Sequence, residues 1–306
     1  MSFRLTGLVA APYTPFHRDG ALNLDIIPAY AEMLVESGVS GVFVCGSTGE
    51  GHSLSVAERI ALTDAWISSA KERFPVIVHV GHNSQPEART LAAHAQAVGA
   101  SAIAALAPSY YKPKSVDDAI DFFAPIAAAA PRLPFYYYNI PSMTGVALPV
   151  PELLKKGRKR IATMQGAKFS HNDLMELQEC LALSDFDIVF GFDEMLLAGL
   201  TLGCKGAVGS TYNFAAPLYH RIIAAFANGD LETARREQRK SVELIRTLFD
   251  FGLMRAGKAI MAMMGIDCGP VRSPLTPISP GESNALHDRL SQFDCFARPL
   301  RHVVGS

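Results

Sequence analysis

The sequence predicts a (β/α)₈ TIM barrel, an α/β fold, followed by a C-terminal helical extension. Short runs with β character alternate with amphipathic helical segments, and only helical patterns follow Gly229. Eight strands in strict alternation with helices favour a closed barrel over an open doubly wound sheet, which usually has fewer strands. We therefore predict a catalytic barrel domain over residues 1–230 and a helical extension over residues 231–306.

The expected strands are short apolar runs bounded by turn residues. They cover residues 7–15, 41–47, 75–81, 100–108, 134–141, 161–170, 186–194 and 206–213. One of the segments between them opens with Ser55 and has Glu58 three residues later, which is a capping-box pattern. The last barrel helix is expected at 215–229, and the helices of the extension at 230–252, 254–265 and 282–293.

Composition excludes several classes of protein. Hydrophobic residues make up 49% of the 306 residues and charged residues 19%, which is typical of a globular chain with a large core. The net charge of −1 and the absence of a basic run predict no binding to nucleic acid or to a membrane surface. The five cysteines have no paired spacing, and neither a signal peptide nor a long apolar run is apparent. We expect a cytoplasmic protein.

The residues at the strand ends are the place to look for chemistry, because barrel enzymes act at the C-terminal ends of their strands. The second strand ends in "CGSTGE", where Gly46 and Gly49 flank Ser47 and Thr48. Two hydroxyls and the amides of a tight turn can hold a carboxylate or a phosphate oxygen. An ordinary turn with a Ser/Thr cap is an equal alternative.

A lysine and a tyrosine stand at two further strand ends. Tyr138 is the last tyrosine of "PFYYYNIP", and such a residue alone more often packs than reacts. Lys168 lies in "QGAKFS", where Gly166 leaves room on the same face of the strand. Lys168 is either a structural side chain, which extends to the rim or pairs with a carboxylate such as Asp193, or an amine nucleophile in a desolvated site.

Two adjacent carboxylates, Asp193 and Glu194, follow the seventh strand. Such a pair can bind a metal, act as acid and base, or accept hydrogen bonds from sugar hydroxyls. No H-x-H or H-E-x-x-H motif occurs, and His79 and His82 are expected on different faces. We therefore expect no metal, which leaves amine chemistry.

Five motifs in this order carry a family resemblance: "GSTGE", "YYYNIP-x-x-TG", "GAKFS", "GFDE" and "GAVGSTYN". The chain resembles, over roughly residues 5–285, the pyruvate-dependent class I aldolases, the family that contains dihydrodipicolinate synthase and N-acetylneuraminate lyase. The similarity is greatest to the branch that cleaves N-acetylneuraminate, through "LSVAER", "AAAAPRLPFYYYNIP" and "GAVGSTYN". The resemblance implies reversible cleavage of that sugar acid to N-acetylmannosamine and pyruvate.

The resemblance also implies a role for each strand-end residue. Lys168 matches the lysine that forms a Schiff base, Tyr138 the phenol that relays protons, and Ser47 and Thr48 the carboxylate clamp. The positions that match contacts to the polyol chain are Ser170, Gly191, Asp193, Glu194 and Ser210. Tyr110 matches an aromatic residue near a subunit interface. A homotetramer, small-molecule substrates and no cofactor other than the covalent Schiff base on Lys168 are implied as well.

Three alternatives stay open at this point. The synthase branch has an arginine in the turn after the fifth strand, where this chain has Met143, so 4-hydroxy-tetrahydrodipicolinate synthase is the second choice. Aldolases of shorter 2-keto-3-deoxy sugar acids would have similar polyol contacts. A barrel that binds a keto acid without turnover is the non-enzyme alternative, which the presence of both Lys168 and Tyr138 disfavours.

Overall fold

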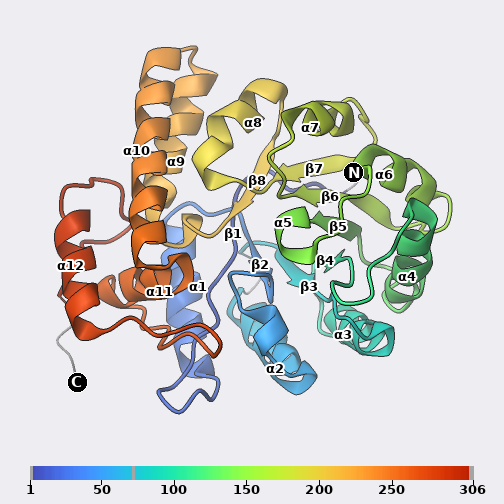
Figure 1. Cartoon of the computed structure of the whole chain (residues 1–306), viewed down its shortest axis with the longest axis horizontal. Helices are drawn as coiled ribbons and strands as arrows, with labels where there is room; N and C mark the ends of the chain where they lie inside the picture. The colour runs from blue at the N-terminus through green and yellow to red at the C-terminus, as the bar shows by residue number, and fades with distance from the viewer. Residues whose placement is uncertain (1–2, 71–72, 303–306) are drawn as a thin grey trace.

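The computed structural model describes residues 3–70 and 73–302 and contains a closed barrel of parallel strands (Figure 1). The strands are β1 Gly7–Ala10, β2 Gly41–Val44, β3 Val76–His79, β4 Ala102–Leu106, β5 Phe135–Asn139, β6 Met164–Phe169, β7 Asp187–Phe190 and β8 Gly206–Gly209. Each strand pairs with the next, and β8 pairs with β1 to close the barrel. The predicted barrel is confirmed. Its strands are shorter than expected because the last residues of most of the predicted runs form the loops at the barrel mouth.

Helices alternate with the strands as predicted. Around the barrel lie α1 Ile27–Glu36, α2 Val56–Ala70, α3 Gln85–Ala97, α4 Val116–Ala128, α6 Val150–Arg158, α7 Leu174–Leu181, α8 Leu196–Leu202 and α9 Tyr212–Ala227, with the short α5 Pro141–Thr144 after β5. The capping box at the start of α2 is present: the Ser55 amide donates to the Glu58 carboxylate at 2.8 Å, and the Glu58 amide donates to the Ser55 hydroxyl at 3.2 Å. This pair satisfies two amides that the first turn leaves free.

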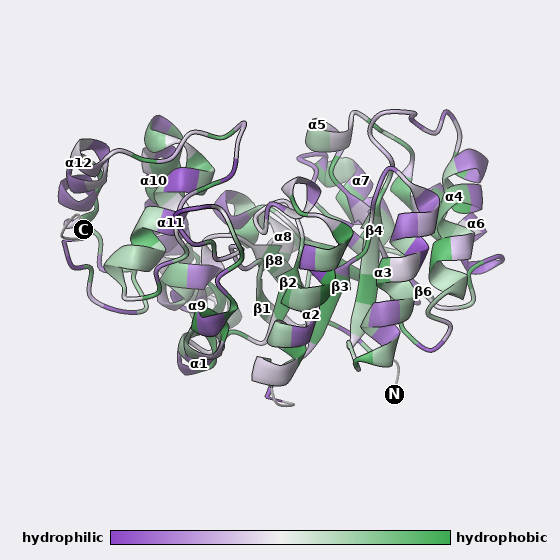
Figure 2. Cartoon of the chain, turned by 90° about the horizontal axis from the view of Figure 1, so that it is seen from below, coloured by the Kyte–Doolittle hydropathy of each residue, from purple (hydrophilic) through white to green (hydrophobic). Residues whose placement is uncertain are grey.

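Strand side chains alternate between two apolar regions. One region fills the barrel interior, and the other lies between the strands and the surrounding helices. Figure 2 shows the strands as largely hydrophobic and the helices as mixed. Lys168 belongs to β6 and is only 5% exposed, so the barrel contains a buried amine.

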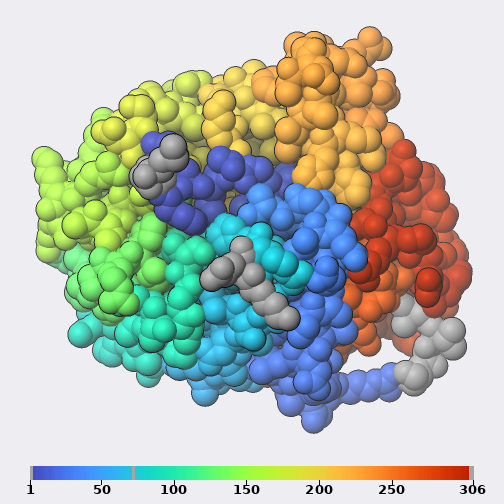
Figure 3. Space-filling view, turned by 180° about the vertical axis from the view of Figure 1, so that it is seen from behind, coloured from blue at the N-terminus to red at the C-terminus, as the bar shows by residue number. Residues whose placement is uncertain are grey.

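The N-terminal segment covers the end of the barrel opposite the loops at the C-terminal ends of the strands. The Leu5 amide and the Tyr136 hydroxyl both donate to the Asp187 carboxylate, at 2.8 and 2.7 Å, and the Phe3 ring meets the Tyr136 ring edge-on. Figure 3 shows the N-terminal residues in the centre of this face. Ligands therefore reach the interior from the opposite end.

The helices after the barrel are α10 Leu231–Phe251, α11 Leu253–Met263 and α12 Pro280–Leu290. They lie together on one side of the barrel, with α10 packed along α9 (Figure 1). Among the residues that the structure describes, no helix is long and apolar enough to cross a membrane. The boundary at residue 230 falls between α9 and α10 and stays a prediction.

Candidate active site

A cavity of about 220 Å³ opens at the C-terminal ends of the strands. All the site residues predicted from the sequence line it, with one exception. They come from the loops or ends of five strands: Ser47 and Thr48 after β2, Tyr138 on β5, Lys168 and Ser170 at β6, Gly191, Asp193 and Glu194 after β7, and Ser210 after β8. The exception is Tyr110.

Lys168 lies at the floor of this cavity between two aromatic rings. Its Nζ is 4.1 Å from the centroid of the Tyr138 ring and 4.4 Å from that of the Phe43 ring. Among the described residues, the lysine ion pairs involve Lys156, Lys240 and Lys258, and none involves Lys168. The structural alternative, an ion pair with Asp193, is therefore not formed. A desolvated amine without a counter-ion is what a lysine nucleophile requires.

Gly166 has a role in packing against the neighbouring strand that the sequence did not indicate. A Cβ at Gly166 would lie 1.7 Å from the main-chain oxygen of Asp187 on β7. The glycine therefore permits close packing of the neighbouring strand. Gly191 is needed for a similar reason, because a Cβ there would lie 2.0 Å from the Ser170 hydroxyl oxygen.

Tyr138 connects the lysine to the loop after β2. Its hydroxyl lies 3.2 Å from the Ser47 hydroxyl, and either group can donate in this contact. The loop is fixed from a second side, since the Thr14 hydroxyl donates to the Gly49 carbonyl at 2.5 Å. The phenol and the Ser47 hydroxyl can therefore pass a proton between them within reach of Lys168.

Asp193 accepts hydrogen bonds that stabilise the loops of the barrel. Its Oδ2 accepts hydrogen bonds from the Thr211 amide at 2.8 Å and from the Thr211 hydroxyl at 2.6 Å. Burial raises the pKa of Asp193, and these bonds and, to a smaller extent, the charge of Lys168 oppose the effect. Its main-chain oxygen accepts from Gln238 on α10. Asp193 thus ties the β7 loop to the β8 loop and to the extension.

Glu194 is the freer of the two carboxylates. It is half-buried at the cavity wall, and burial raises its pKa, with a smaller contribution in the same direction from Asp193. Glu194 is therefore the carboxylate that is better placed to meet a ligand.

Tyr110 and Met143 lie outside the cavity lining. Tyr110 is 78% exposed and Tyr111 86% exposed, and their rings meet at right angles with centroids 5.0 Å apart. Met143 is 67% exposed on α5, and its neighbour Ser142 lines the cavity instead. Within this chain alone, neither Tyr110 nor Met143 contributes to the cavity.

Sequence reasoning missed the apolar side of the cavity. Ile245 and Phe249 on α10 and Leu253 on α11 form a wall opposite the polar loops. In the sequence these residues belong to ordinary amphipathic helices, and no local signal separates them from core positions. The extension is therefore part of the candidate active site.

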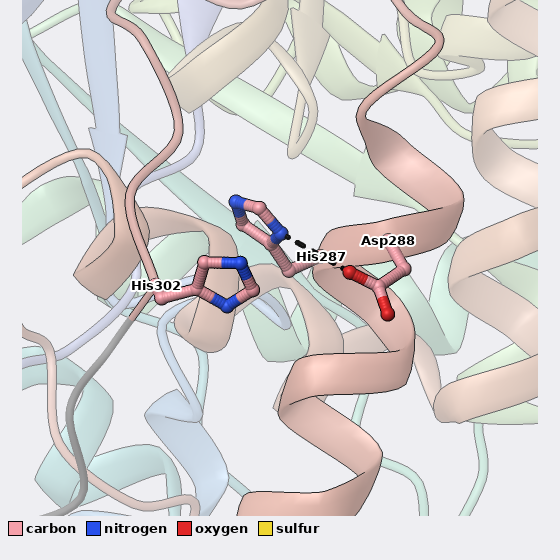
Figure 4. Close-up of side chains that lie close together, drawn as sticks. All are labelled: His287, Asp288 and His302. Carbon is pink, nitrogen blue, oxygen red and sulfur yellow. Dashed lines mark ion pairs between the residues drawn. The ribbon is translucent and has the colours of Figure 1, made fainter.

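One histidine cluster elsewhere has a composition suited to metals. Ligand atoms of His287, Asp288 and His302 lie within 4.8 Å of one another on α12 and the segment after it (Figure 4). The two imidazole rings are stacked, with centroids 3.7 Å apart and 35° between their planes. Metal ligation requires in-plane ring nitrogens that converge on one point, which stacking does not favour. The cluster is remote in sequence from the strand-end residues and does not line their cavity.

Comparison with known proteins places the chain in a family. Residues 4–293 match the Dihydrodipicolinate synthetase family. The chain belongs to this family. The family resemblance read from the strand-end motifs is confirmed, and the match spans both the barrel and most of the helical extension.

Several members of the dihydrodipicolinate synthetase family are close to this chain. N-acetylneuraminate lyase of Gallus gallus is 43% identical over 283 residues, which cover 90% of this chain and 92% of that protein. The solved N-acetylneuraminate lyase (sialic acid aldolase) of Aliivibrio salmonicida is 41% identical, covers 94% of this chain and 97% of its own, and has a TM-score of 0.92. The Proteus mirabilis N-acetylneuraminate lyase structure is 37% identical, with coverages of 94% and 98% and the same TM-score.

Proposed function

We propose that the chain is an N-acetylneuraminate lyase, a carbon–carbon lyase that cleaves N-acetylneuraminate reversibly to N-acetylmannosamine and pyruvate. The observation that carries the proposal is Lys168, a buried amine that forms no ion pair with any described residue. It lies beside Tyr138 in a cavity that Ser47 and Glu194 also line. Relatives that carry this name match the chain over about nine-tenths of its length or more, which supports the same reading.

The reaction begins with a covalent bond to the substrate ketone. The Lys168 nitrogen adds to the C2 carbonyl carbon, and loss of one water molecule gives a protonated imine. This cation attracts electrons as a metal or an organic cofactor would, so the proposed chemistry uses no cofactor beyond the imine on Lys168.

Cleavage then breaks the bond between C3 and C4 of the substrate. The C4 hydroxyl gives up its proton, C4 becomes the aldehyde of N-acetylmannosamine, and the electron pair of the broken bond moves into the imine to form an enamine. Tyr138 accepts this proton as its own phenolic proton passes to the substrate carboxylate, with the Ser47 hydroxyl beside it. The proton returns by the same route to C3 of the enamine, and water then hydrolyses the imine, which releases pyruvate and restores Lys168.

The Ser47 and Thr48 turn is proposed to hold the substrate carboxylate. Two hydroxyls on one side of Lys168 fix the orientation of the keto acid, so that little rotational freedom is lost at the moment of attack. The polyol chain then extends between Glu194 and Ser210 on one side and the apolar wall of Ile245, Phe249 and Leu253 on the other.

A pyruvate-release assay across sialic acids and 2-keto-3-deoxy acids tests this function. N-acetylneuraminate is expected to give the highest kcat/KM, and condensation of pyruvate with aspartate semialdehyde should not proceed at a useful rate. The turn after β5 supports the second expectation. The residues that it contributes to the cavity lining are Ile140 and Ser142, and neither carries a positive charge that could bind a second carboxylate. Efficient condensation would assign the chain to the synthase branch instead, and a six-carbon keto-deoxy acid as best substrate would move the assignment to the shorter sugar acids.

Substitution of each carboxylate separates binding from folding. Glu194→Ala should lower kcat/KM for N-acetylneuraminate by about tenfold, because hydroxyls of the chain lose an acceptor, while imine formation with pyruvate stays near that of the parent. Asp193→Ala should also lower stability, by about 1–3 kcal/mol, because it leaves the Thr211 amide and hydroxyl without their acceptor. Steady-state kinetics and urea unfolding measure the two effects. Unchanged kinetics in Glu194→Ala would mean that this carboxylate does not contact the substrate.

The assembly and the location of the enzyme are part of the proposal. The exposed pair Tyr110 and Tyr111 supports a contact with a second copy of the chain, in the homotetramer that the family resemblance implies. Sedimentation at micromolar concentration tests this assembly. The five buried and unpaired cysteines fit a reducing cytoplasm, which cell fractionation tests.

A further inference from the structure

Behind the Ser47 turn lies a buried cation that the proposed mechanism does not use. Arg59 on α2 is 1% exposed, and its guanidinium donates to the carbonyls of Gly81 at 2.9 Å and His79 at 2.5 Å. The arginine ion pairs of the described residues involve Arg73, Arg160, Arg221, Arg236, Arg255, Arg272, Arg289 and Arg298, not Arg59. A buried arginine without a carboxylate is costly unless another anion balances its charge.

His79, at the end of β3, connects this arginine to the cavity. It is 1% exposed, and its Nδ1 lies 3.0 Å from the Cys45 carbonyl. A carbonyl only accepts, so the shorter contact, to Cys45, requires the proton on Nδ1; the Arg59 guanidinium lies 3.5 Å from the same atom. With that proton on Nδ1, Nε2 is a buried acceptor with no partner among the described residues. Burial and, next, the charge of Arg59 lower the pKa of His79, so the ring is neutral.

The carbonyl that His79 holds belongs to a strained residue. Cys45 has a φ of 60°, in the left-handed region that residues other than glycine rarely adopt. Its carbonyl occupies the space of a Cβ at Gly51, which would lie 1.9 Å away. A strained backbone conformation of this kind persists only where neighbouring groups stabilise it. Ser47 follows Cys45 by two residues. The position of the Ser47 hydroxyl therefore depends on the hydrogen bond from His79.

His79 also contacts the reacting side of the cavity. Its ring meets the Tyr138 ring edge-on, with centroids 5.7 Å apart and 86° between the planes. The same imidazole therefore contacts the Tyr138 ring and the Cys45 carbonyl, two residues before Ser47.

We propose that His79 and Arg59 are positioning residues for the substrate carboxylate. His79 holds the Cys45 turn in the conformation that presents Ser47 and Thr48, and Arg59 holds His79 and supplies the buried positive charge that the bound carboxylate balances. The inference rests on the proposed keto-acid chemistry, and it adds two residues that do not line the cavity.

The test measures how much pyruvate is needed to form the imine. Borohydride traps the imine at a series of pyruvate concentrations, and mass spectrometry gives the labelled fraction. His79→Leu should raise the half-saturating pyruvate concentration about tenfold, the effect of one buried hydrogen bond whose partner is left unpaired. His79→Asn should restore most of the affinity, because its amide nitrogen occupies the place of Nδ1. His94→Leu, which removes an imidazole paired with Asp64 at the surface, is the matched control.

The labelling results distinguish failure of the proposed function from failure of the proposed roles of His79 and Arg59. A parent chain that pyruvate does not label overturns the proposed function. A labelled parent with unchanged half-saturation in His79→Leu overturns only the positioning roles, as does an equal shift in His94→Leu. If His79→Leu does not fold, Arg59→Lys decides, because lysine keeps the charge but lacks the planar guanidinium that reaches both carbonyls. A raised half-saturating concentration in Arg59→Lys, with an unchanged maximum of labelling, supports the proposal, and an unchanged concentration rejects it.

Discussion

Reduction of the chain with borohydride in the presence of pyruvate should add one pyruvyl unit to the peptide that contains Lys168. Lys168 is the buried lysine that combines a place at the cavity floor with the absence of a counter-ion among the described residues. Lys168→Arg keeps the charge but cannot form the imine, so lyase activity should fall to background and labelling should disappear.

Two controls sharpen this experiment. Lys205, an exposed lysine just before β8, should be unlabelled, and Lys205→Arg should retain parental activity. Activity that persists in Lys168→Arg, or label on another lysine, would overturn the imine mechanism. Loss of activity with EDTA that zinc restores would point instead to a metal-dependent aldolase.

Lys258→Met should cause the largest loss of stability, about 3–5 kcal/mol, because it leaves the buried carboxylate of Glu50 without its charge partner. The Lys258 Nζ lies 2.8 Å from the Glu50 carboxylate, and each side chain is 2% exposed. Each partner of the pair makes a further hydrogen bond: the Lys258 Nζ donates to the Pro270 carbonyl at 2.7 Å, and the Arg272 amide donates to the Glu50 carboxylate at 2.8 Å. Urea unfolding measures the change.

A double variant and a surface control test the ion pair between Glu50 and Lys258 further. Glu50→Gln should destabilise the fold for the same reason, and the double variant Glu50→Gln, Lys258→Met should lose less than the sum of the two single variants. Lys156→Met, which removes an exposed ion pair with Glu152, should change stability little. Parental stability in Lys258→Met would show that the buried pair does not hold the β2 loop to α11.

The strand-end residues were predictable because two local patterns coincide in them. The alternation of strands and helices along the sequence predicts where each strand ends. In a barrel, the residues at the C-terminal end of a strand lie at the mouth, so Ser47, Tyr138 and Lys168 could be located before any contact was known. The contacts themselves depend on register. Gly166 faces Asp187 because β6 and β7 pair at that position, and nothing in "QGAKFS" specifies this neighbour.

Residues whose surroundings come from distant segments were not predictable. Arg59 sits in a helical pattern that is compatible with a solvent-exposed arginine, yet the docking of α2 against β3 buries it. Phe249 and Ile245 read as one face of an amphipathic helix, and only the packing of α10 against the barrel brings them to the cavity. Local sequence carries no information about such docking.

The wall formed by Ile245, Phe249 and Leu253 has a consequence for the order in which the active site is made. The ribosome translates Ser47, Tyr138 and Lys168 well before α10 and α11. Domains generally fold from the N-terminus onward during synthesis. A nascent chain that has folded only its barrel therefore holds the reactive amine in a cavity open to water on one side. The apolar wall is complete only when α10 and α11 have emerged and docked.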